Sequence, residues 1–166
     1  MENRDLPQLT NFEYFREKLF RKISVHSAVV EHQPNGDILG GSNAFLTARD
    51  WARFGHLYMS DGVWNGVRLL PEGWVDYTRT PAPTRSSYGA QWWIRDEPTP
   101  DHYHMGGFRS QGVYLMPSKK LMVVRLAMPS IILSERRVCV CPLGSCVVAH
   151  VVVVCCLLTG GTKVSS

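Results

Sequence analysis

Two stretches of the chain place apolar residues at the spacing of a helix that buries one face. Residues 12–20 form the first, with apolar side chains at Phe12, Phe15, Leu19 and Phe20. The second follows Thr47 and Asp50, which have the spacing of a capping box at a helix start. Its apolar positions are Trp51, Phe54, Leu57 and Tyr58. We therefore expect two amphipathic helices, the second of which ends at Asp61 and Gly62.

Turn-forming residues divide the chain between these helices and residue 126. An Asn-Gly pair predicts a tight hairpin over 63–68, and Pro71 predicts the start of a helix over 72–77. Three apolar runs are expected to be strands, with a turn between the last two: 88–94, 111–116 and 121–126. Helices followed by neighbouring strands predict an α+β fold, with an antiparallel sheet and flanking helices.

Composition narrows the class of protein. The chain has 166 residues, of which 45% are hydrophobic and 19% charged, and its net charge is +4. The length suits one domain, and the apolar content excludes an intrinsically disordered chain. Lys and Arg are scattered along the sequence, so no nucleic-acid partner is expected. The first ten residues are polar and of mixed charge, so no signal peptide is expected either.

The composition changes abruptly near residue 130. All 5 cysteines lie between Cys139 and Cys156, and Lys163 is the only charged residue after Arg137. A disulfide framework would spread its cysteines through the fold, which this chain does not do. We therefore divide the chain into residues 1–130 and an atypical Cys- and Val-rich tail, 131–166, which need not belong to the same fold.

Three interpretations of the tail are open. Residues 138–158 are uncharged and long enough to span a bilayer, although Pro142 and Gly144 interrupt them, so membrane contact is expected only here, if at all. The valines at 151–154 favour a buried strand pair. The abrupt change in composition favours the third interpretation, a terminus from a shifted or misjoined reading frame. The cysteines lack the paired C-x₂-C spacing of a zinc site.

Four segments occur in an order and spacing that resemble one family. They are LFRKISVHSA at 19–28, GGSNAFLTARDWARFGHLYMSDGVWNGVRLLPEGWV at 40–75, YGAQWWI at 88–94 and HMGGFRSQGVYLMPSKKLMVVRL at 104–126. They span about two thirds of the chain and resemble the C-terminal part of the beta-lactamase-related serine hydrolases. This family includes class C-type beta-lactamases, D-alanyl-D-alanine carboxypeptidases, esterases and oligomer amidases. The resemblance implies a partial beta-lactamase/transpeptidase-like fold over residues 1–130.

The resemblance also implies acyl transfer or hydrolysis of an amide or ester through a serine acyl-enzyme. In the family, a serine on S-x-x-K attacks, and the lysine and a tyrosine from Y-x-N move protons. A third motif, K-T-G or H-x-G, lies on an edge strand, where a backbone N–H donates to the oxyanion. This chemistry needs an activated nucleophile and preorganised donors. The implied partner is a small-molecule or peptide-like acyl substrate, with no cofactor and no metal.

The first two motifs are absent from this sequence. No Ser is followed three residues later by Lys, and no Tyr is followed two residues later by Asn. The family's order would place both motifs before residue 12. We therefore expect a C-terminal fragment of such a hydrolase that is inactive by itself. The alternative is a non-catalytic binding or interaction module that retains part of the fold, with or without a membrane anchor in its tail.

The third motif is present in two registers. Reading His104, Met105 and Gly106 as H-x-G makes the N–H of Gly107 the oxyanion donor. Reading G-x-x-G-Q instead makes Gly107 the motif glycine and the N–H of Phe108 the donor, with a serine at position 110 in place of the usual glycine. The second register is preferred. The candidate catalytic residues are His104, Gly106, Gly107 and Phe108.

Structural roles compete with these assignments. His104 can be a hydrogen-bonded histidine at a strand end. His102 and His104 share one strand face and could form a metal-ligand pair, but no third ligand is apparent. Ser42 lies in GGSNA, which lacks the last glycine of a nucleophile elbow, so we expect a turn serine.

Two expectations concern side-chain direction. Trp92 and Trp93 are neighbours on a predicted strand, so one is expected in the core and the other beside a substrate groove. Three arginines are expected at the surface or in salt bridges: Arg49, Arg53 and Arg125.

Overall fold

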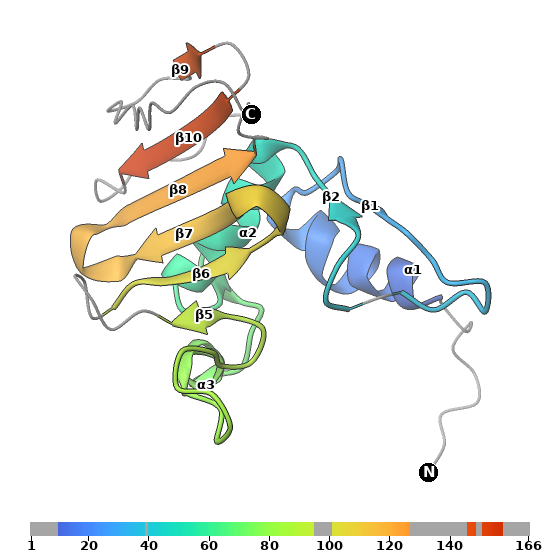
Figure 1. Cartoon of the computed structure of the whole chain (residues 1–166). Helices are drawn as coiled ribbons and strands as arrows, with labels where there is room; N and C mark the ends of the chain where they lie inside the picture. The colour runs from blue at the N-terminus through green and yellow to red at the C-terminus, as the bar shows by residue number, and fades with distance from the viewer. Residues whose placement is uncertain (1–9, 39, 95–100, 127–145, 149–150, 158–166) are drawn as a thin grey trace.

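An antiparallel sheet lies at the centre of the fold (Figure 1). The protein is seen in a computed structural model, which describes residues 10–38, 40–94, 101–126, 146–148 and 151–157. The sheet has the order β5-β6-β7-β8-β10-β9. Its strands are β5 (Trp93–Ile94), β6 (Tyr103–Gly106), β7 (Gly112–Met116), β8 (Leu121–Leu126), β9 (Cys146–Val148) and β10 (Val151–Leu157). Together with the helices, this sheet confirms the predicted α+β fold.

The strand expected over 88–94 is shorter than predicted. Of the predicted residues 88–94, only Trp93 and Ile94, which form β5, pair within the sheet. The chain turns before them, at Gln91, whose φ is 68°. A backbone hydrogen bond from Gly89 to Trp92 closes this turn at 2.8 Å. The apolar pattern also missed β6, because histidine and glycine interrupt the alternation of apolar residues there.

The helix predicted from its capping signal is α2 (Ala48–Met59). The Thr47 hydroxyl accepts a hydrogen bond from the N–H of Asp50 at 3.3 Å, which confirms the predicted N-cap. On the predicted apolar face, Leu57 is fully buried. The other three residues of that face are partly buried against the core: Trp51, Phe54 and Tyr58.

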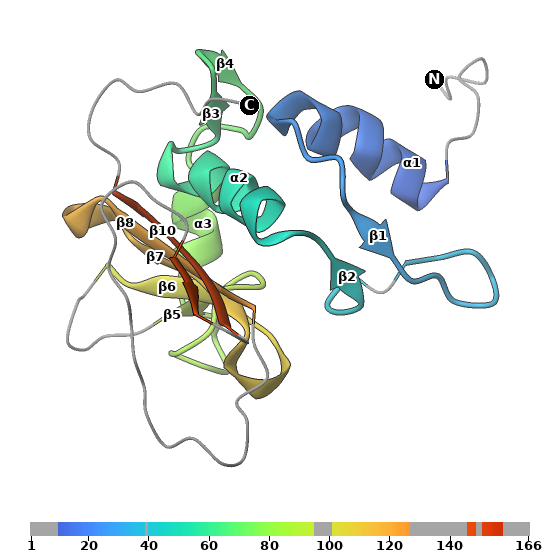
Figure 2. The same ribbon diagram turned by 90° about the horizontal axis from the view of Figure 1, so that it is seen from above.

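A glycine lets α2 lie close to the sheet. A Cβ atom on Gly55 would lie 2.5 Å from the sulfur of Met122 and 2.8 Å from a methyl group of Val113. Both distances are well below van der Waals contact, so a larger residue would push the helix away from β7 and β8. Figures 1 and 2 show α2 along one face of the sheet. The strand residues buried on that face are Tyr103, Val113, Leu115, Met122 and Val124.

Asp50 joins the start of α2 to the segment before it. Its carboxylate is 3% exposed and accepts from the N–H groups of His26 (3.1 Å) and Ser27 (2.9 Å). It also accepts from the Ser27 hydroxyl at 2.6 Å and pairs with Arg53, as predicted for that arginine. Unlike a standard capping box, the N–H of Thr47 donates to the Ser27 hydroxyl at 2.9 Å. Burial raises the pKa of Asp50, but hydrogen bonds from Ser27, Arg53 and His26 outweigh burial and lower it.

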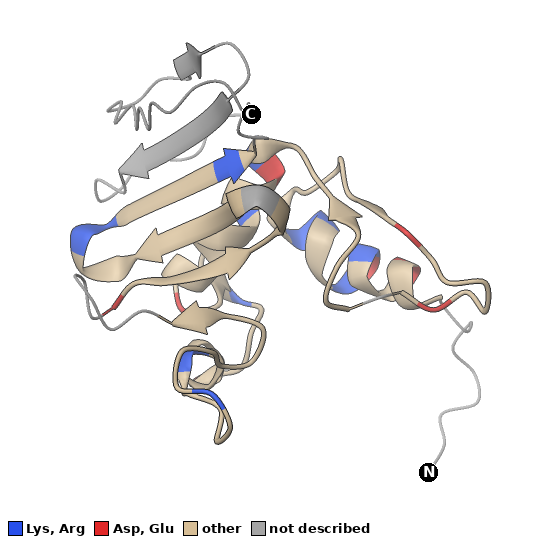
Figure 3. Ribbon diagram, viewed as in Figure 1, with Lys and Arg blue, Asp and Glu red and all other residues tan. Residues whose placement is uncertain are grey.

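The first predicted helix changes its winding along its length. α1 (Asn11–Phe15) continues as a π-helical turn, η1 (Arg16–Phe20), and a 3₁₀ turn, η2 (Arg21–Ile23). Phe15, at the end of α1, is 42% exposed, contrary to the prediction. Leu19 and Phe20 still pack against a second small core. Figure 3 shows basic and acidic residues interspersed along this segment.

The connecting elements are short. Asn65 and Gly66, at φ 47° and 81°, form the predicted hairpin turn. The predicted helix after Pro71 begins later, at α3 (Trp74–Arg79), because Gly73 has φ 76°. The other short elements are β1 (Val29–Val30), β2 (Ala44–Phe45), β3 (Val63–Trp64), β4 (Val67–Arg68), η3 (Phe108–Ser110) and η4 (Pro117–Lys119).

The described part of the tail forms a strand pair, which is one of its three interpretations. β10 pairs with β8 from Val152 opposite Leu126 to Leu157 opposite Leu121, and with β9 on its other side. Residues 127–145, which include Cys139 and Cys141, lie outside the described residues, and so does about half of the proposed membrane span. Among the described residues, no helix is long and apolar enough to cross a membrane. The domain division near residue 130 stays a prediction.

We expect Asp50→Ala to lower the free energy of unfolding by about 2–4 kcal/mol, because it leaves buried N–H donors without their acceptor. Urea unfolding at pH 7 measures this loss. The pKa of Asp50 is lowered in the folded state, so its contribution is lost as pH falls through that pKa. The difference between parent and variant should therefore shrink in acid. Glu17→Ala, which removes an exposed ion pair, is the control and should cost about 0.5 kcal/mol at most.

We expect the protein to lose stability as pH falls from about 6.5, in part through His56. Burial lowers the pKa of His56, so the unfolded chain takes up the proton first. His56→Phe and His56→Gln should both reduce the slope of unfolding free energy between pH 7 and pH 5. His56→Phe keeps a ring edge-on to Trp64, whereas His56→Gln does not. An unchanged slope in both variants would contradict the assignment.

Candidate functional site

β6 presents its side chains alternately to the two faces of the sheet. Tyr103 and Met105 face the core beneath α2, and Tyr103 is 1% exposed. His104 and Gly106 therefore lie on the opposite face, away from α2 (Figure 2). The predicted H-x-G motif thus places its histidine and glycine together on the face of the strand opposite α2.

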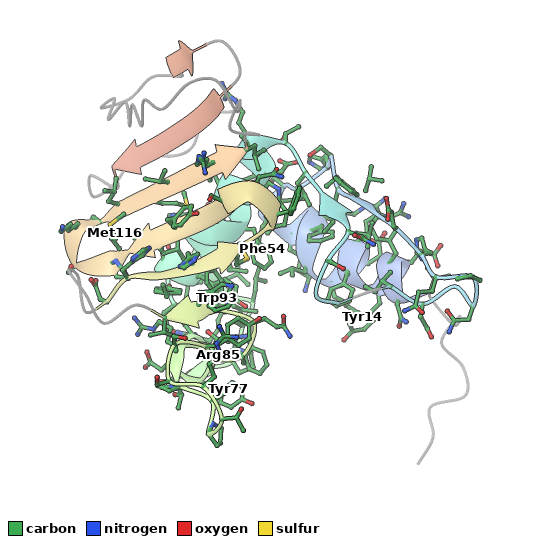
Figure 4. All side chains as sticks on the ribbon, viewed as in Figure 1. Tyr14, Phe54, Tyr77, Arg85, Trp93 and Met116 are labelled. Atoms are coloured by element: carbon green, nitrogen blue, oxygen red, sulfur yellow. The ribbon has the colours of Figure 1, made fainter. Side chains whose placement is uncertain are left out.

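A row of aromatic rings crosses that face of the sheet. His104 lies between Trp93 on β5 and Tyr114 on β7, at ring-centre distances of 6.4 and 4.9 Å. The rings are nearly parallel, with interplanar angles of 20° and 14°. The guanidinium carbon of Arg85 lies over the Trp93 ring, 4.6 Å from its centre, and both residues are labelled in Figure 4. Trp92 is 2% exposed in the core, so the predicted opposite directions of the two tryptophans are confirmed.

The motif strand is not an edge strand among the described residues, which corrects the expectation from the family. β5 pairs with β6, placing Trp93 opposite His104 and Ile94 opposite Tyr103. This pairing covers the first half of β6. The second half pairs only with β7 in the described sheet, where Gly106 lies opposite Gly112. The glycine end of the motif is therefore where the strand is open on one side.

A glycine-rich turn follows this open end. Gly107 has extended backbone, and its N–H donates to the carbonyl of Gln111 at 2.7 Å. Phe108 opens the 3₁₀ turn η3, and its side chain is 75% exposed. The N–H of Gln111 donates back to the carbonyl of Phe108 at 3.3 Å. These two bonds close the reversal from β6 into β7.

The turn geometry bears on the two registers of the motif. The N–H of Gly107, the donor in the first register, points to the Gln111 carbonyl. The second register, with the N–H of Phe108 as donor, does not need that group. Packing explains the glycine at position 106, because a Cβ there would lie 3.2 Å from the Trp93 ring. A Cβ on Gly107 would lie 3.7 Å from its nearest neighbour, Gln111, which is an ordinary van der Waals contact. The candidate residues His104, Gly106, Gly107 and Phe108 are contiguous here, and their catalytic role stays a prediction.

Ser110 occupies a backbone conformation that favours glycine. Its φ is 61°, which explains why the resembling family carries glycine there. A left-handed conformation costs an L-residue about 1–2 kcal/mol. The Ser110 carbonyl accepts from the Arg125 guanidinium at 2.9 Å and from the Tyr114 hydroxyl at 3.2 Å. Arg125, expected at the surface or in a salt bridge, makes its hydrogen bond to this backbone carbonyl at an exposed position.

Sequence reasoning missed Tyr114 and Arg125 as residues of this site. They lie on β7 and β8, at positions that alternate with the buried Val113, Leu115 and Val124. That alternation shows the face on which they lie. Their contact with the turn depends on the register of β7 with β8, which places Arg125 opposite Gly112.

A hollow of about 290 Å³ lies near the start of β6. Its described lining residues are Asp76, Arg79, Ile94, Asp101, His102 and Tyr103. The Arg79 guanidinium lies 5.1 Å over the Tyr103 ring and pairs with Asp76. Burial raises the pKa of Tyr103, so its phenol stays protonated. None of these described residues belongs to the candidate catalytic set, so the hollow is separate from the glycine turn.

The other residues considered in the sequence analysis are a glycine pair, a serine and a histidine pair. Gly40 and Gly41 form a turn, and Ser42 lies in the bend that follows, as predicted. The rings of His102 and His104 are 5.4 Å apart. Among the described residues, no group of three His, Cys, Asp or Glu side chains could hold a metal ion.

Comparison with solved structures identifies the architecture. The chain matches a protein assigned as a 6-aminohexanoate-dimer hydrolase from Bacillus anthracis, with 27% sequence identity and a TM-score of 0.55. That protein belongs to the beta-lactamase-related serine hydrolase superfamily. The chain has a beta-lactamase-like fold. The match covers 63% of this chain and 29% of the hydrolase, so the chain spans under a third of that protein. Neither the protein-family models nor the curated proteins gave a match.

We expect Ser110→Gly to raise the free energy of unfolding by about 0.5–1 kcal/mol, because glycine relieves the left-handed strain but adds freedom to the unfolded chain. Thermal and urea unfolding measure the gain. Ser86→Gly is the matched control, since Ser86 is also exposed but is not among the residues at positive φ. A Ser110→Gly protein no more stable than the Ser86→Gly protein would contradict the strain.

Proposed function

We propose that this chain forms the oxyanion-binding, C-terminal part of a beta-lactamase-related serine hydrolase. The hydrolase would cleave an amide or ester in a small-molecule or peptide-like substrate through a serine acyl-enzyme. The observation that carries the proposal is the structural likeness to the Bacillus anthracis hydrolase over 63% of the chain. The glycine turn at the open end of β6 supports it, because it directly follows the strand that carries His104, as the third family motif requires.

The chemical contribution of the turn is electrostatic. In acyl transfer, the attacked carbonyl oxygen becomes an oxyanion, and a fixed N–H that points at it lowers the barrier. The N–H of Phe108 is the proposed donor, as in the preferred register of the motif. His104 lies on the same strand face, where its imidazole can donate a hydrogen bond to a bound acyl group. The serine, lysine and tyrosine of the reaction would come from outside this sequence.

A linear amide is the first substrate to test, because the structural neighbour is assigned as a 6-aminohexanoate-dimer hydrolase. The nucleophile and its base are supplied by grafting: residues 40–126 of this chain replace the matching segment of that hydrolase. We expect the chimaera to hydrolyse the linear 6-aminohexanoate dimer. A chimaera that folds but shows no hydrolysis would contradict the proposal.

Within this chimaera, we expect Phe108→Pro to lower kcat about 10²–10³-fold, because proline removes the proposed oxyanion donor. The backbone suits proline, since Gly107 is extended and Phe108 is the first residue of a 3₁₀ turn. Phe108→Ala is the matched control: it keeps the N–H and removes only an exposed ring, so kcat should change little. Equal rates in the two variants would remove Phe108 as the donor.

We expect the 166-residue chain by itself to show no hydrolysis above background. Residues that act as a catalytic unit fail together when the nucleophile is missing. The assays are hydrolysis of nitrocefin and p-nitrophenyl acetate, and covalent labelling with a penicillin or fluorophosphonate probe. The control is the chain with His104→Ala and Ser42→Ala. Turnover in the parent that disappears in this control would show that the chain carries its own nucleophile.

A further inference from the structure

The turn between β6 and β7 is tied to the sheet through one carbonyl group. The Ser110 carbonyl accepts two side-chain hydrogen bonds, from Arg125 Nη1 at 2.9 Å and from Tyr114 Oη at 3.2 Å. Tyr114 comes from β7 and Arg125 from β8, so the turn is held by both strands that follow it. In β5 to β8, Arg125 near the end of β8 is the one Lys, Arg, Asp or Glu, and Figure 3 shows a basic stretch there.

The carbonyl that these groups hold belongs to a residue in a strained backbone conformation. Ser110 is at φ 61°, where the backbone would relax if nothing held it. A guanidinium gives a charge-assisted hydrogen bond, which is stronger than one between neutral groups. At the other end of the turn, the N–H of Gly107 bonds to Gln111. Hydrogen bonds therefore hold the turn at Gly107 and at Ser110, on both sides of Phe108.

Tyr114 has a second contact at the site. Its ring stacks on His104 at 4.9 Å with an interplanar angle of 14°, while its hydroxyl reaches Ser110. One side chain therefore touches both the histidine of the motif and the turn that follows. A change at Tyr114 can be divided chemically, because phenylalanine removes only the hydroxyl and leucine removes the ring as well.

We propose that Arg125 and Tyr114 are positioning residues that hold the turn 107–111 and the His104 ring in one arrangement. The catalytic meaning of that arrangement rests on the proposed function, whereas the arrangement itself does not. The test therefore uses the full chain without substrate. Hydrogen exchange of backbone amides and NMR resonances of His104 report on the turn and on the ring separately.

The first measurement is exchange at the amide of Gly107, whose hydrogen bond closes the turn. We expect Arg125→Met and Tyr114→Phe to speed this exchange about tenfold, while the amide of Val124 in β8 keeps its rate. Arg125→Lys keeps the charge and one donor, so it should restore part of the protection. Arg68→Met is the matched control, because Arg68 also donates to backbone carbonyls, at Asp61 and Leu70, in another part of the fold.

The second measurement follows the imidazole protons of His104. Tyr114→Phe should leave their resonances in place, and Tyr114→Leu should move them, because only leucine removes the stacked ring. Unchanged exchange at Gly107 in both Arg125→Met and Tyr114→Phe would overturn the proposal. Faster exchange spread equally over β7 and β8 would also overturn it, since that result means a general role in stability. An inactive chimaera with the expected exchange pattern would refute the proposed function alone.

Discussion

The contact between α2 and the sheet determines which residues of β6, β7 and β8 are buried and which lie on the opposite face. Because residue 55 has no side chain, the helix lies directly on Met122 and Val113. That contact buries one face of β6, β7 and β8, and alternation along each strand then places every second residue on the other face. His104, Gly106, Tyr114 and Arg125 owe their shared surface to this choice of face.

The two faces of the sheet differ in their contacts. Apolar packing dominates the face that α2 covers, and polar and aromatic contacts connect the residues on the opposite face. Trp93, His104 and Tyr114 stack in a row because the strand register places them opposite one another. Beyond this row, the turn leaves the ladder at Gly106 and returns at Gly112. A Cβ on Gly112 would lie 2.4 Å from the Met105 carbonyl, so glycine is needed there for the strands to approach. Strain at Ser110 is the cost of making this reversal without a glycine at that position.

Serine hydrolysis divides its work between a nucleophile that attacks and donors that stabilise the resulting charge. The proposed function assigns the second part to the described residues, namely His104 on β6 and the glycine turn that follows it. The likeness to a hydrolase at 27% identity is consistent with that part of the fold. Two observations support the proposal that the chain is part of a hydrolase. The sequence contains only the third family motif, and the structural match covers only 29% of the hydrolase.

Local chemistry in the sequence was sufficient for some of this structure. Thr47 predicted the start of α2, Asn65 and Gly66 predicted a hairpin, and the tryptophan pair predicted opposite faces, because caps, turns and strand alternation depend on near neighbours. It was not sufficient for β6, where histidines and glycines hide the alternation, or for the short β5. Only the tertiary structure shows that β5 pairs with the motif strand β6 and that Arg125 donates a hydrogen bond to the Ser110 carbonyl. Both depend on how distant strands align, and a one-residue change of register would turn those side chains to the other face.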